Sequence, residues 1–240
     1  MMKIALIGYG KMGHIIEEVA RGRGHEVVCI IDKDNTQDFD SEAFAGADVA
    51  IEFTTPATAE ENILRAWNKG KPVVCGTTGW DVEAFVAQHS ENLQSRGLVW
   101  ASNYSIGVNI LFALNRQLAE MMSQFADYQP SIEEIHHIHK LDAPSGTAKT
   151  LQCAIKDVQC ATKGEERKQA MDVAVPITSI REGEVAGIHT VTWDSDVDTL
   201  SISHSAKSRK GFAMGAVLAA EWIVGKKGFH TFSEIIMTNK

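Results

Sequence analysis

The 240-residue chain lacks several features that mark particular classes of protein. It has no basic excess, because 23 lysines and arginines stand against 31 acidic residues, a net charge of −8. That balance argues against a general nucleic-acid binder or a protein of anionic membrane surfaces. No run of about 18 uncharged apolar residues occurs, so no transmembrane helix is expected. The N-terminal apolar run is soon interrupted by Lys11, unlike the core of a signal peptide.

The four cysteines include no C-x-x-C pair, and prolines number 5 against 19 glycines. Cys29 and Cys75 lie in apolar runs typical of buried strands, which favours free thiols in a reducing compartment. We therefore expect a cytoplasmic protein with tight turns. An apolar fraction of 44% indicates an ordinary folded chain with room for one large or two modest domains.

The first hundred residues alternate short apolar runs with helix-like stretches. The expected strands are Lys3–Gly8, Glu26–Asp32, Asp48–Phe53, Lys71–Cys75 and Leu98–Ser102, and the expected helices include His14–Arg23 and Ala59–Asn68. Strands that are apolar almost throughout, with helices between them, predict an α/β fold with a Rossmann-type, doubly wound parallel sheet.

The pattern changes after Asn103. Asn109–Met122 and Phe212–Val224 have helical spacing, residues 154–170 are polar enough to predict a mobile loop, and residues 174–203 alternate like antiparallel strands. We expect a dinucleotide-binding domain of residues 1–106 plus 210–240, with an inserted α+β domain of residues 107–209.

The first expected turn, Gly8-Tyr9-Gly10-Lys11-Met12-Gly13, has the pattern G-x-G-x-x-G between a strand and a helix. The three glycines permit a tight turn, close approach of a pyrophosphate, and close packing of helix on strand. Asp32 follows about 20 residues later, where a carboxylate accepts ribose hydroxyls, which favours NAD. Lys33 offsets the charge of Asp32, so NADP stays open.

Two further segments follow expected strands, where ligands bind in parallel sheets. Gly76-Thr77-Thr78-Gly79 and Ser102-Asn103-Tyr104-Ser105 suit a nicotinamide and its ribose, although each also fits an ordinary polar turn. Glu52 and Thr54–Pro56 carry the same ambiguity.

Histidines gather in the run from Glu134 to Ala148, where His136, His137 and His139 precede Lys140. An imidazole that titrates near neutrality and an ammonium four residues on share a face in a helix or a strand, and this segment fits either. Pro144-Ser145-Gly146-Thr147 predicts a helix start capped by Ser145, and so a carboxylate site. No zinc is expected, because no cysteine or carboxylate with ligand spacing stands beside the histidines. A solvated strand is the remaining alternative.

The run E-x-H-H-x-x-K-x-D-A-P-S-G-T-A resembles the signature of the 4-hydroxy-tetrahydrodipicolinate (dihydrodipicolinate) reductase family. The glycine turn, E-F-T-x-P, G-T-T-G and S-N-Y-S-I-G-V-N match that family in the same order. The resemblance implies reduction of a cyclic imine dicarboxylate by NADH or NADPH in lysine biosynthesis. It also implies a homotetramer built through the inserted, substrate-binding domain, with no nucleic-acid or membrane partner.

The resemblance also implies residue roles. It makes His136 a proton donor or acceptor, makes Lys140 a second proton donor, and assigns the substrate carboxylates to His137, Gly146 and Thr147. The dinucleotide would be bound by Gly8, Tyr9, Gly10, Lys11, Met12, Gly13, Asp32, Gly76, Thr77, Thr78, Ser102, Asn103, Tyr104 and Ser105.

The chain departs from the family pattern at Lys33 and Thr55, where many members have arginine, which weakens the case for NADP. The linker between Asp32 and Asp48 is also short. Two alternatives remain: a related reductase acting on an amino acid or semialdehyde, and a non-catalytic dinucleotide sensor.

Overall fold

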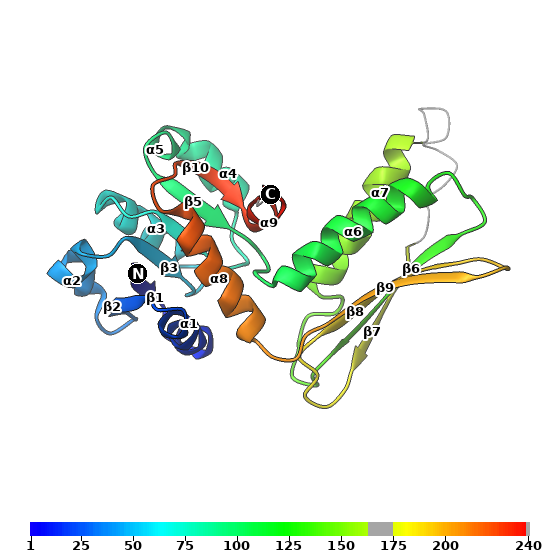
Figure 1. Cartoon of the computed structure of the whole chain (residues 1–240), viewed down its shortest axis with the longest axis horizontal. Helices are drawn as coiled ribbons and strands as arrows, with labels where there is room; N and C mark the ends of the chain where they lie inside the picture. The colour runs from blue at the N-terminus through cyan, green and yellow to red at the C-terminus, as the bar shows by residue number, and fades with distance from the viewer. Residues whose placement is uncertain (163–174, 239–240) are drawn as a thin grey trace. The chain divides into compact units, whose positions relative to one another are not determined.

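The computed structural model describes residues 1–162 and 175–238 (Figure 1). The chain divides into two compact units, each of which is described by itself. Unit 1 comprises Met1–Ile106 and Arg209–Lys240, and unit 2 comprises Gly107–Ser208. None of the helices in the described ranges is long and apolar enough to span a membrane.

Unit 1 is built on a six-stranded parallel sheet in the order β10-β5-β4-β3-β1-β2, which confirms the predicted doubly wound fold. Its strands are β1 (Lys3–Ile7), β2 (Glu26–Ile31), β3 (Val49–Glu52), β4 (Val73–Cys75), β5 (Gly97–Trp100) and β10 (Gly228–Thr231). Figure 1 shows β10, near the end of the chain, lying beside β5 from its middle. The sequence reading missed β10 because it is a short, half-buried segment without an apolar run.

Helices cover both faces of this sheet. They are α1 (Lys11–Gly22), the 3-10 helix η1 (Thr36–Asp40), α2 (Glu42–Ala45), α3 (Ala59–Asn68), α4 (Val82–Gln88), α5 (Ser90–Leu93), α8 (Lys210–Ile223) and α9 (Phe232–Thr238). Leu6 and Ile51 point into the core shared with α1, α8 and α9. Ile7 and Ala50 point into the opposite core, with α3 and Phe85. The strands are apolar throughout because both of their faces are buried.

Unit 2 is a four-stranded mixed sheet in the order β7-β6-β8-β9, with two helices packed on one face (Figure 1). Its elements are α6 (Ile106–Met122), β6 (Gln129–His136), α7 (Gly146–Thr162), β7 (Ile177–Arg181), β8 (Ile188–Asp194) and β9 (Thr199–Ser205). Trp193 and Ile132 of the sheet pack with Leu151 and Ile155 of α7 in one core.

Two sequence predictions for unit 2 were wrong in part. Residues 154–162, expected in a loop, are the second half of α7, because Ile155 and Val158 complete its buried stripe; the rest of that expected loop lies outside the described residues. The strands are not all antiparallel: β8 pairs antiparallel with β6 and β9, but β7 runs parallel to β6. The alternation that predicted strands carries no information about their direction.

Candidate functional site

The glycine turn between β1 and α1 has the geometry that its sequence predicts. Gly8 has a φ of 92°, and a Cβ on it would lie 2.2 Å from the carbonyl oxygen of Phe53. A Cβ on Gly13 would lie 2.5 Å from the carbonyl oxygen of Gly8. Any side chain at either position would therefore push the turn away from β3 or from α1.

Gly10 has a different role in the same turn. No atom lies within 4 Å of a Cβ built on it, and no side chain caps the N-terminus of α1, which follows directly. Backbone N–H groups at an uncapped helix start favour an anion, and the helix dipole adds to that preference. The turn therefore fits a dinucleotide pyrophosphate.

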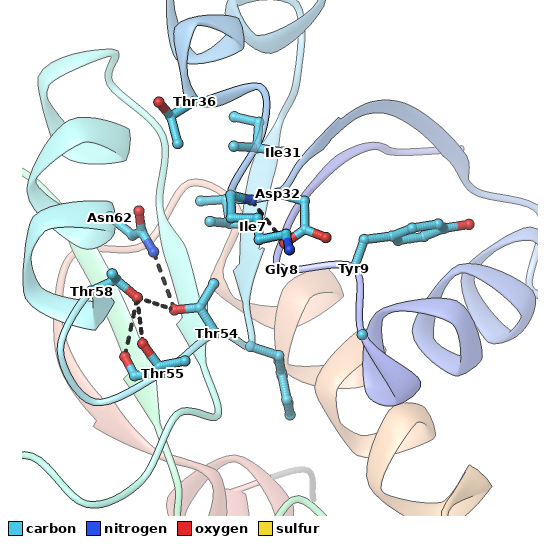
Figure 2. Close-up of a pocket in the computed structure, with 13 residues that line it drawn as sticks. Ile7, Gly8, Tyr9, Ile31, Asp32, Thr36, Thr54, Thr55, Thr58 and Asn62 are labelled. Carbon is cyan, nitrogen blue, oxygen red and sulfur yellow. Dashed lines mark hydrogen bonds between the residues drawn. The ribbon is translucent and has the colours of Figure 1, made fainter.

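A cavity of about 340 Å³ opens at the carboxyl ends of β1, β2 and β3. It is lined by Ile7, Gly8, Tyr9, Gly10, Ile31, Asp32, Lys33, Thr36, Phe53, Thr54, Thr55, Thr58 and Asn62. Figure 2 shows Asp32 beside Gly8, with the threonines and Asn62 across the cavity. The carboxylate of Asp32 accepts a hydrogen bond from the backbone N–H of Lys33, the one cation among the described residues of this lining. A cavity with one carboxylate and one lysine fits adenosine ribose hydroxyls.

Tyr9 and the two residues after Gly10 stand around the same turn. The Tyr9 hydroxyl hydrogen bonds to Glu17, and its ring packs on His14, so its side chain lies against α1. Lys11 is exposed at the first position of α1, and Met12 packs against the unit 1 core.

Glu52, at the end of β3, is fully buried. Its carboxylate accepts hydrogen bonds from the backbone N–H and the hydroxyl of Thr54 and lies 3.0 Å from the Cys75 Sγ. Burial, together with this carboxylate, raises the pKa of the Cys75 thiol well above its ordinary value. Glu52 therefore shapes the turn that lines the cavity rather than facing the cavity itself.

The other two predicted cofactor segments follow β4 and β5 at the same edge of the sheet. The backbone of Gly76 packs against the Phe53 ring, and a Cβ on Gly76 would lie 2.2 Å from that ring. The hydroxyl of Thr77 accepts from the backbone N–H of Thr54 at 2.9 Å. Thr78 is exposed at this edge.

In the second of these segments, Ser102 is exposed and Asn103 accepts a hydrogen bond from the backbone N–H of Ser105. Tyr104 lies in the core, where its hydroxyl donates to the carbonyl oxygen of Cys75 at 2.8 Å. The side chain of Tyr104 therefore supports the sheet edge from beneath.

In unit 2, the histidine run is a strand as far as His136, the last residue of β6, and a turn after it. His136 is 7% exposed, and His137 donates its backbone N–H to the carbonyl oxygen of Val185. The Lys140 ammonium lies 2.7 Å from the carboxylate of Asp142. The choice between helix and strand, which the residues alone left open, is thus decided by pairing of β6 with β7 and β8.

A buried carboxylate, Glu134, lies two residues before His136 on the same face of β6. It accepts hydrogen bonds from the backbone N–H of Ser145 at 3.1 Å, from the Ser179 hydroxyl at 2.8 Å and from Arg181 at 3.1 Å. Burial alone would raise the pKa of Glu134, but these hydrogen bonds outweigh it and lower the pKa to about 2. Glu134 is therefore a fixed negative charge.

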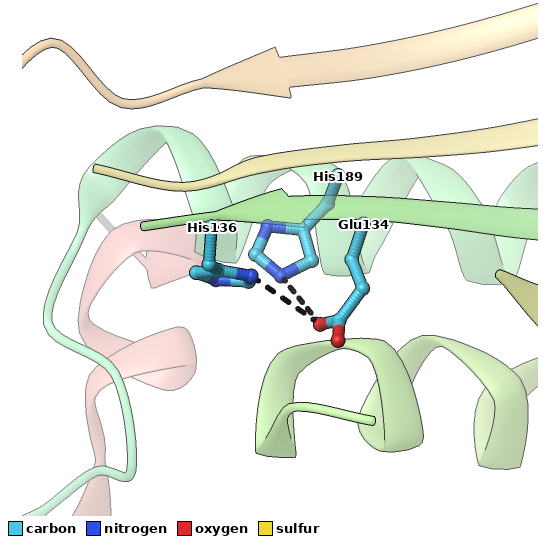
Figure 3. A group of neighbouring side chains, drawn as sticks. All are labelled: Glu134, His136 and His189. Atoms are coloured by element: carbon cyan, nitrogen blue, oxygen red, sulfur yellow. Dashed lines mark ion pairs between the residues drawn. The ribbon is translucent and has the colours of Figure 1, made fainter. Parts of the chain in front are cut away.

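Two imidazoles face this carboxylate, as Figure 3 shows. The Nδ1 of His136 lies 3.6 Å and the Nε2 of His189 lies 3.8 Å from the Oε2 of Glu134. The two rings meet edge to face at 4.9 Å. Burial lowers the pKa of His136, and burial with the nearby His136 lowers that of His189 to about 4. Both rings are therefore mainly neutral at pH 7.

His189 was missed from the sequence because it lies on β8, far along the chain from the histidine run. The signal was present in the alternation of I-H-T-V-T-W, which places His189 on the same buried face as Val191 and Trp193. The expectation that no carboxylate stands beside the histidines was wrong. Ligand atoms of Glu134, His136 and His189 lie within 4.8 Å of one another, although Arg181 already neutralises the carboxylate.

The residues Ser145–Thr147, which we call the α7 turn, begin helix α7. The Ser145 hydroxyl accepts from the backbone N–H of Ala148 at 3.2 Å, which confirms the predicted cap. In the described part of the chain, nothing lies within 4 Å of a Cβ on Gly146, so these residues leave the backbone there open to a ligand. An open helix start next to a fixed acid and two neutral imidazoles can bind a carboxylate and move a proton.

Comparisons with known proteins cover both units. The family model "Dihydrodipicolinate reductase, N-terminus" matches residues 2–104, and "Dihydrodipicolinate reductase, C-terminus" matches residues 107–236. A 4-hydroxy-tetrahydrodipicolinate reductase of Christiangramia forsetii is 44% identical over 235 residues, 98% of each chain. One of Thermosipho africanus is 35% identical over 238 residues, again 98% of each chain.

Solved structures share the fold. A dipicolinate-bound dihydrodipicolinate reductase from Paenisporosarcina sp. TG-14 has a TM-score of 0.76 at 22% identity, covering 98% of this chain and 99% of that one. GenD2 from gentamicin A biosynthesis, solved with NAD, has a TM-score of 0.57 at 14% identity, covering 98% of this chain and 90% of that one.

Proposed function

The chain belongs to the dihydrodipicolinate reductase family, and we propose that it reduces 4-hydroxy-tetrahydrodipicolinate to tetrahydrodipicolinate with NADH or NADPH, the 4-hydroxyl group leaving as water. The observation that carries the proposal is in unit 2, where an open helix start and two neutral imidazoles are built around one buried acid, Glu134. A dicarboxylate that must accept a proton needs such groups.

The proposed roles of the residues are those that the resemblance to the family implies. The nicotinamide, when bound, supplies the hydride. His136 delivers the proton that the neighbouring ring carbon requires, and Lys140 is a second proton donor. His137, Gly146 and Thr147 hold the substrate carboxylates. Because His136 lies beside this site, arrival of a dianion raises its pKa and favours its protonated form at the moment when a proton is needed.

For the cofactor, we propose that Gly8–Gly13, Asp32, Gly76–Thr78 and Ser102–Ser105 bind the dinucleotide, and that NADH is favoured over NADPH. The carboxylate of Asp32 repels a 2′-phosphate, and Lys33 is the one cation among the residues lining the cavity. One lysine offsets this repulsion only in part, so NADPH is used less efficiently.

We also propose that four copies of the chain assemble through unit 2 and that the enzyme works in the cytoplasm, in lysine biosynthesis. The resemblance to the family carries this proposal. The β8–β9 hairpin exposes the apolar side chains of Val197 (83%) and Leu200 (43%), which an interface at this hairpin would cover. Light scattering of the purified protein measures the copy number.

The test of the reaction measures oxidation of NADH and of NADPH with freshly prepared imine, in the wild type and in His136→Gln. We expect turnover with the imine and a loss of at least about 100-fold in kcat for the variant. Unchanged kcat would remove His136 from the mechanism. Activity only with aspartate or homoserine would favour the related reductase, and NADH binding without any turnover would favour the dinucleotide sensor.

A further inference from the structure

We propose that Glu134 and His189 are positioning residues that hold the His136 imidazole and the α7 turn in one arrangement. The distance between the His136 imidazole, which moves the proton, and the backbone of the α7 turn, which binds a carboxylate, then stays constant. The inference rests on the proposed function, because it assigns the two residues to the site of that reaction.

Glu134 joins three elements at one point. Its carboxylate lies on β6, accepts from β7 through Ser179 and Arg181, and accepts from the backbone N–H of Ser145 at the start of α7. Arg181 also donates to the carbonyl oxygen of Asp142 at 2.6 Å, in the loop between β6 and α7. A buried carboxylate with this many charge-assisted hydrogen bonds leaves the α7 turn little freedom to move relative to β6.

His189 joins the same two parts from β8. Its Nε2 lies 3.2 Å from the Ser145 hydroxyl, which itself caps α7, and its ring packs edge to face on His136. His189 is 4% exposed and His136 is 7% exposed, so both rings are buried and His136 is the slightly more exposed of the two.

On the Nε2 side of the ring, the residue next to His136 is a glycine, Gly187. A Cβ on Gly187 would lie 3.2 Å from the His136 Nε2, and Gly187 has a φ of 146°. The Nδ1 side of the ring faces Glu134 at 3.6 Å. The imidazole thus has an acid on one side and bare backbone on the other, which leaves Nε2 as the atom that meets a substrate.

The charges around His136 decide what each substitution does to it. Glu134 and Asp142 raise the pKa of His136, and Lys140 and Arg181 lower it. The ring of His189 faces His136, and His189 is itself paired with His204 on the neighbouring strand β9. Loss of the Glu134 charge removes the nearest acid, so Lys140 and Arg181 lower the pKa of His136 further. Loss of neutral His189 changes the geometry of the site but not its charge at pH 7.

The first test is Glu134→Gln, with Glu133→Gln as the matched control. Glu133 is the exposed neighbour on the same strand, so its substitution removes the same charge from the opposite face. We expect Glu134→Gln to raise KM for the imine at least about tenfold, because the α7 turn loses its anchor. The limb of the kcat/KM profile that reports His136 should move to lower pH by about 1 unit, and KM for NADH should stay within about twofold.

The second test compares His189→Phe with His189→Gln. Phenylalanine keeps the ring but loses the contact to Ser145, whereas the glutamine amide reaches the position of Nε2. We expect the phenylalanine variant to bind the imine about tenfold more weakly and the glutamine variant to recover most of that loss. Neither should shift the pH profile. If Glu134→Gln does not fold, the comparison of His189→Phe with His189→Gln is sufficient to test the proposal.

Binding of pyridine-2,6-dicarboxylate, followed by calorimetry, gives a measurement that needs no turnover. The proposal requires weaker binding in Glu134→Gln and His189→Phe than in the wild type. Wild-type binding in both variants, together with a wild-type pH profile in Glu134→Gln, would overturn it. Tight Zn²⁺ binding by the wild type that both variants lose would also overturn it, by assigning the group to a metal. A wild type that binds this probe without reducing the imine would instead refute the proposed function.

Discussion

The buried imidazole of His189 leads to a prediction about stability that is independent of activity. Burial and the nearby His136 lower its pKa from 6.5 to about 4 in the folded chain, whereas in the unfolded chain it returns to about 6.5. Below pH 6.5 the unfolded state therefore binds a proton that the folded state refuses. The associated stability is complete above pH 6.5 and is lost as the pH falls toward 4.

The magnitude follows from the size of the shift. One pKa unit corresponds to about 1.4 kcal/mol, so a shift from 6.5 to about 4 amounts to about 3 kcal/mol across that window. Glutamine at this position has no proton to gain. His189→Gln should therefore remove this part of the pH dependence and flatten the stability curve of unit 2 between pH 6.5 and 4.

Hydrogen exchange of the β6 and β8 amides measures this effect in unit 2 alone, which avoids treating a two-unit chain as a single transition. The comparison runs from pH 7 to pH 4.5 in the wild type, in His189→Gln and in His139→Gln, a control at an exposed histidine. His136 and His204 are present in all three proteins, and the interaction of His136 with His189 is part of the measured effect. Parallel curves for the wild type and His189→Gln would refute the reasoning.

Three further predictions concern the glycine turn, the bare side of the imidazole and the cofactor. Gly8→Ala should lower the melting temperature by several degrees, because its φ is 92° and its Cβ would meet a backbone oxygen at 2.2 Å; Gly10→Ala should fold normally but weaken NADH binding about tenfold in fluorescence titration. Gly187→Ala should lower kcat at least about tenfold in the NADH-oxidation assay with the imine while leaving NADH affinity intact, because a methyl group would crowd the His136 Nε2. Asp32→Asn should narrow the preference for NADH by about tenfold in the ratio of kcat/KM values, and an unchanged ratio would contradict the role of its charge.

Local patterns were sufficient for five of the six strands of unit 1. Strands buried on both faces must be apolar throughout, and a turn residue that packs against another backbone must be glycine. Both features can therefore be recognised in short stretches of sequence. The glycine turn at Gly8 and the helix Ala59–Asn68 are where the sequence predicted them. The short strand β10 has no such feature, because it joins the sheet only through its pairing with β5.

Short-range patterns in the sequence predicted the parallel sheet, the glycine turn and a histidine-rich run followed by a capped helix. Only the tertiary structure decided that this run is a strand as far as His136, that α7 extends to Thr162, and that β7 runs parallel to β6. It also brought His189 to Glu134, and it buried Tyr104 beneath the sheet edge. The difference comes from the distance along the chain over which each effect acts. Propensity, periodicity and turn chemistry act over a few residues, whereas strand direction and the meeting of buried polar groups depend on partners far apart in the chain.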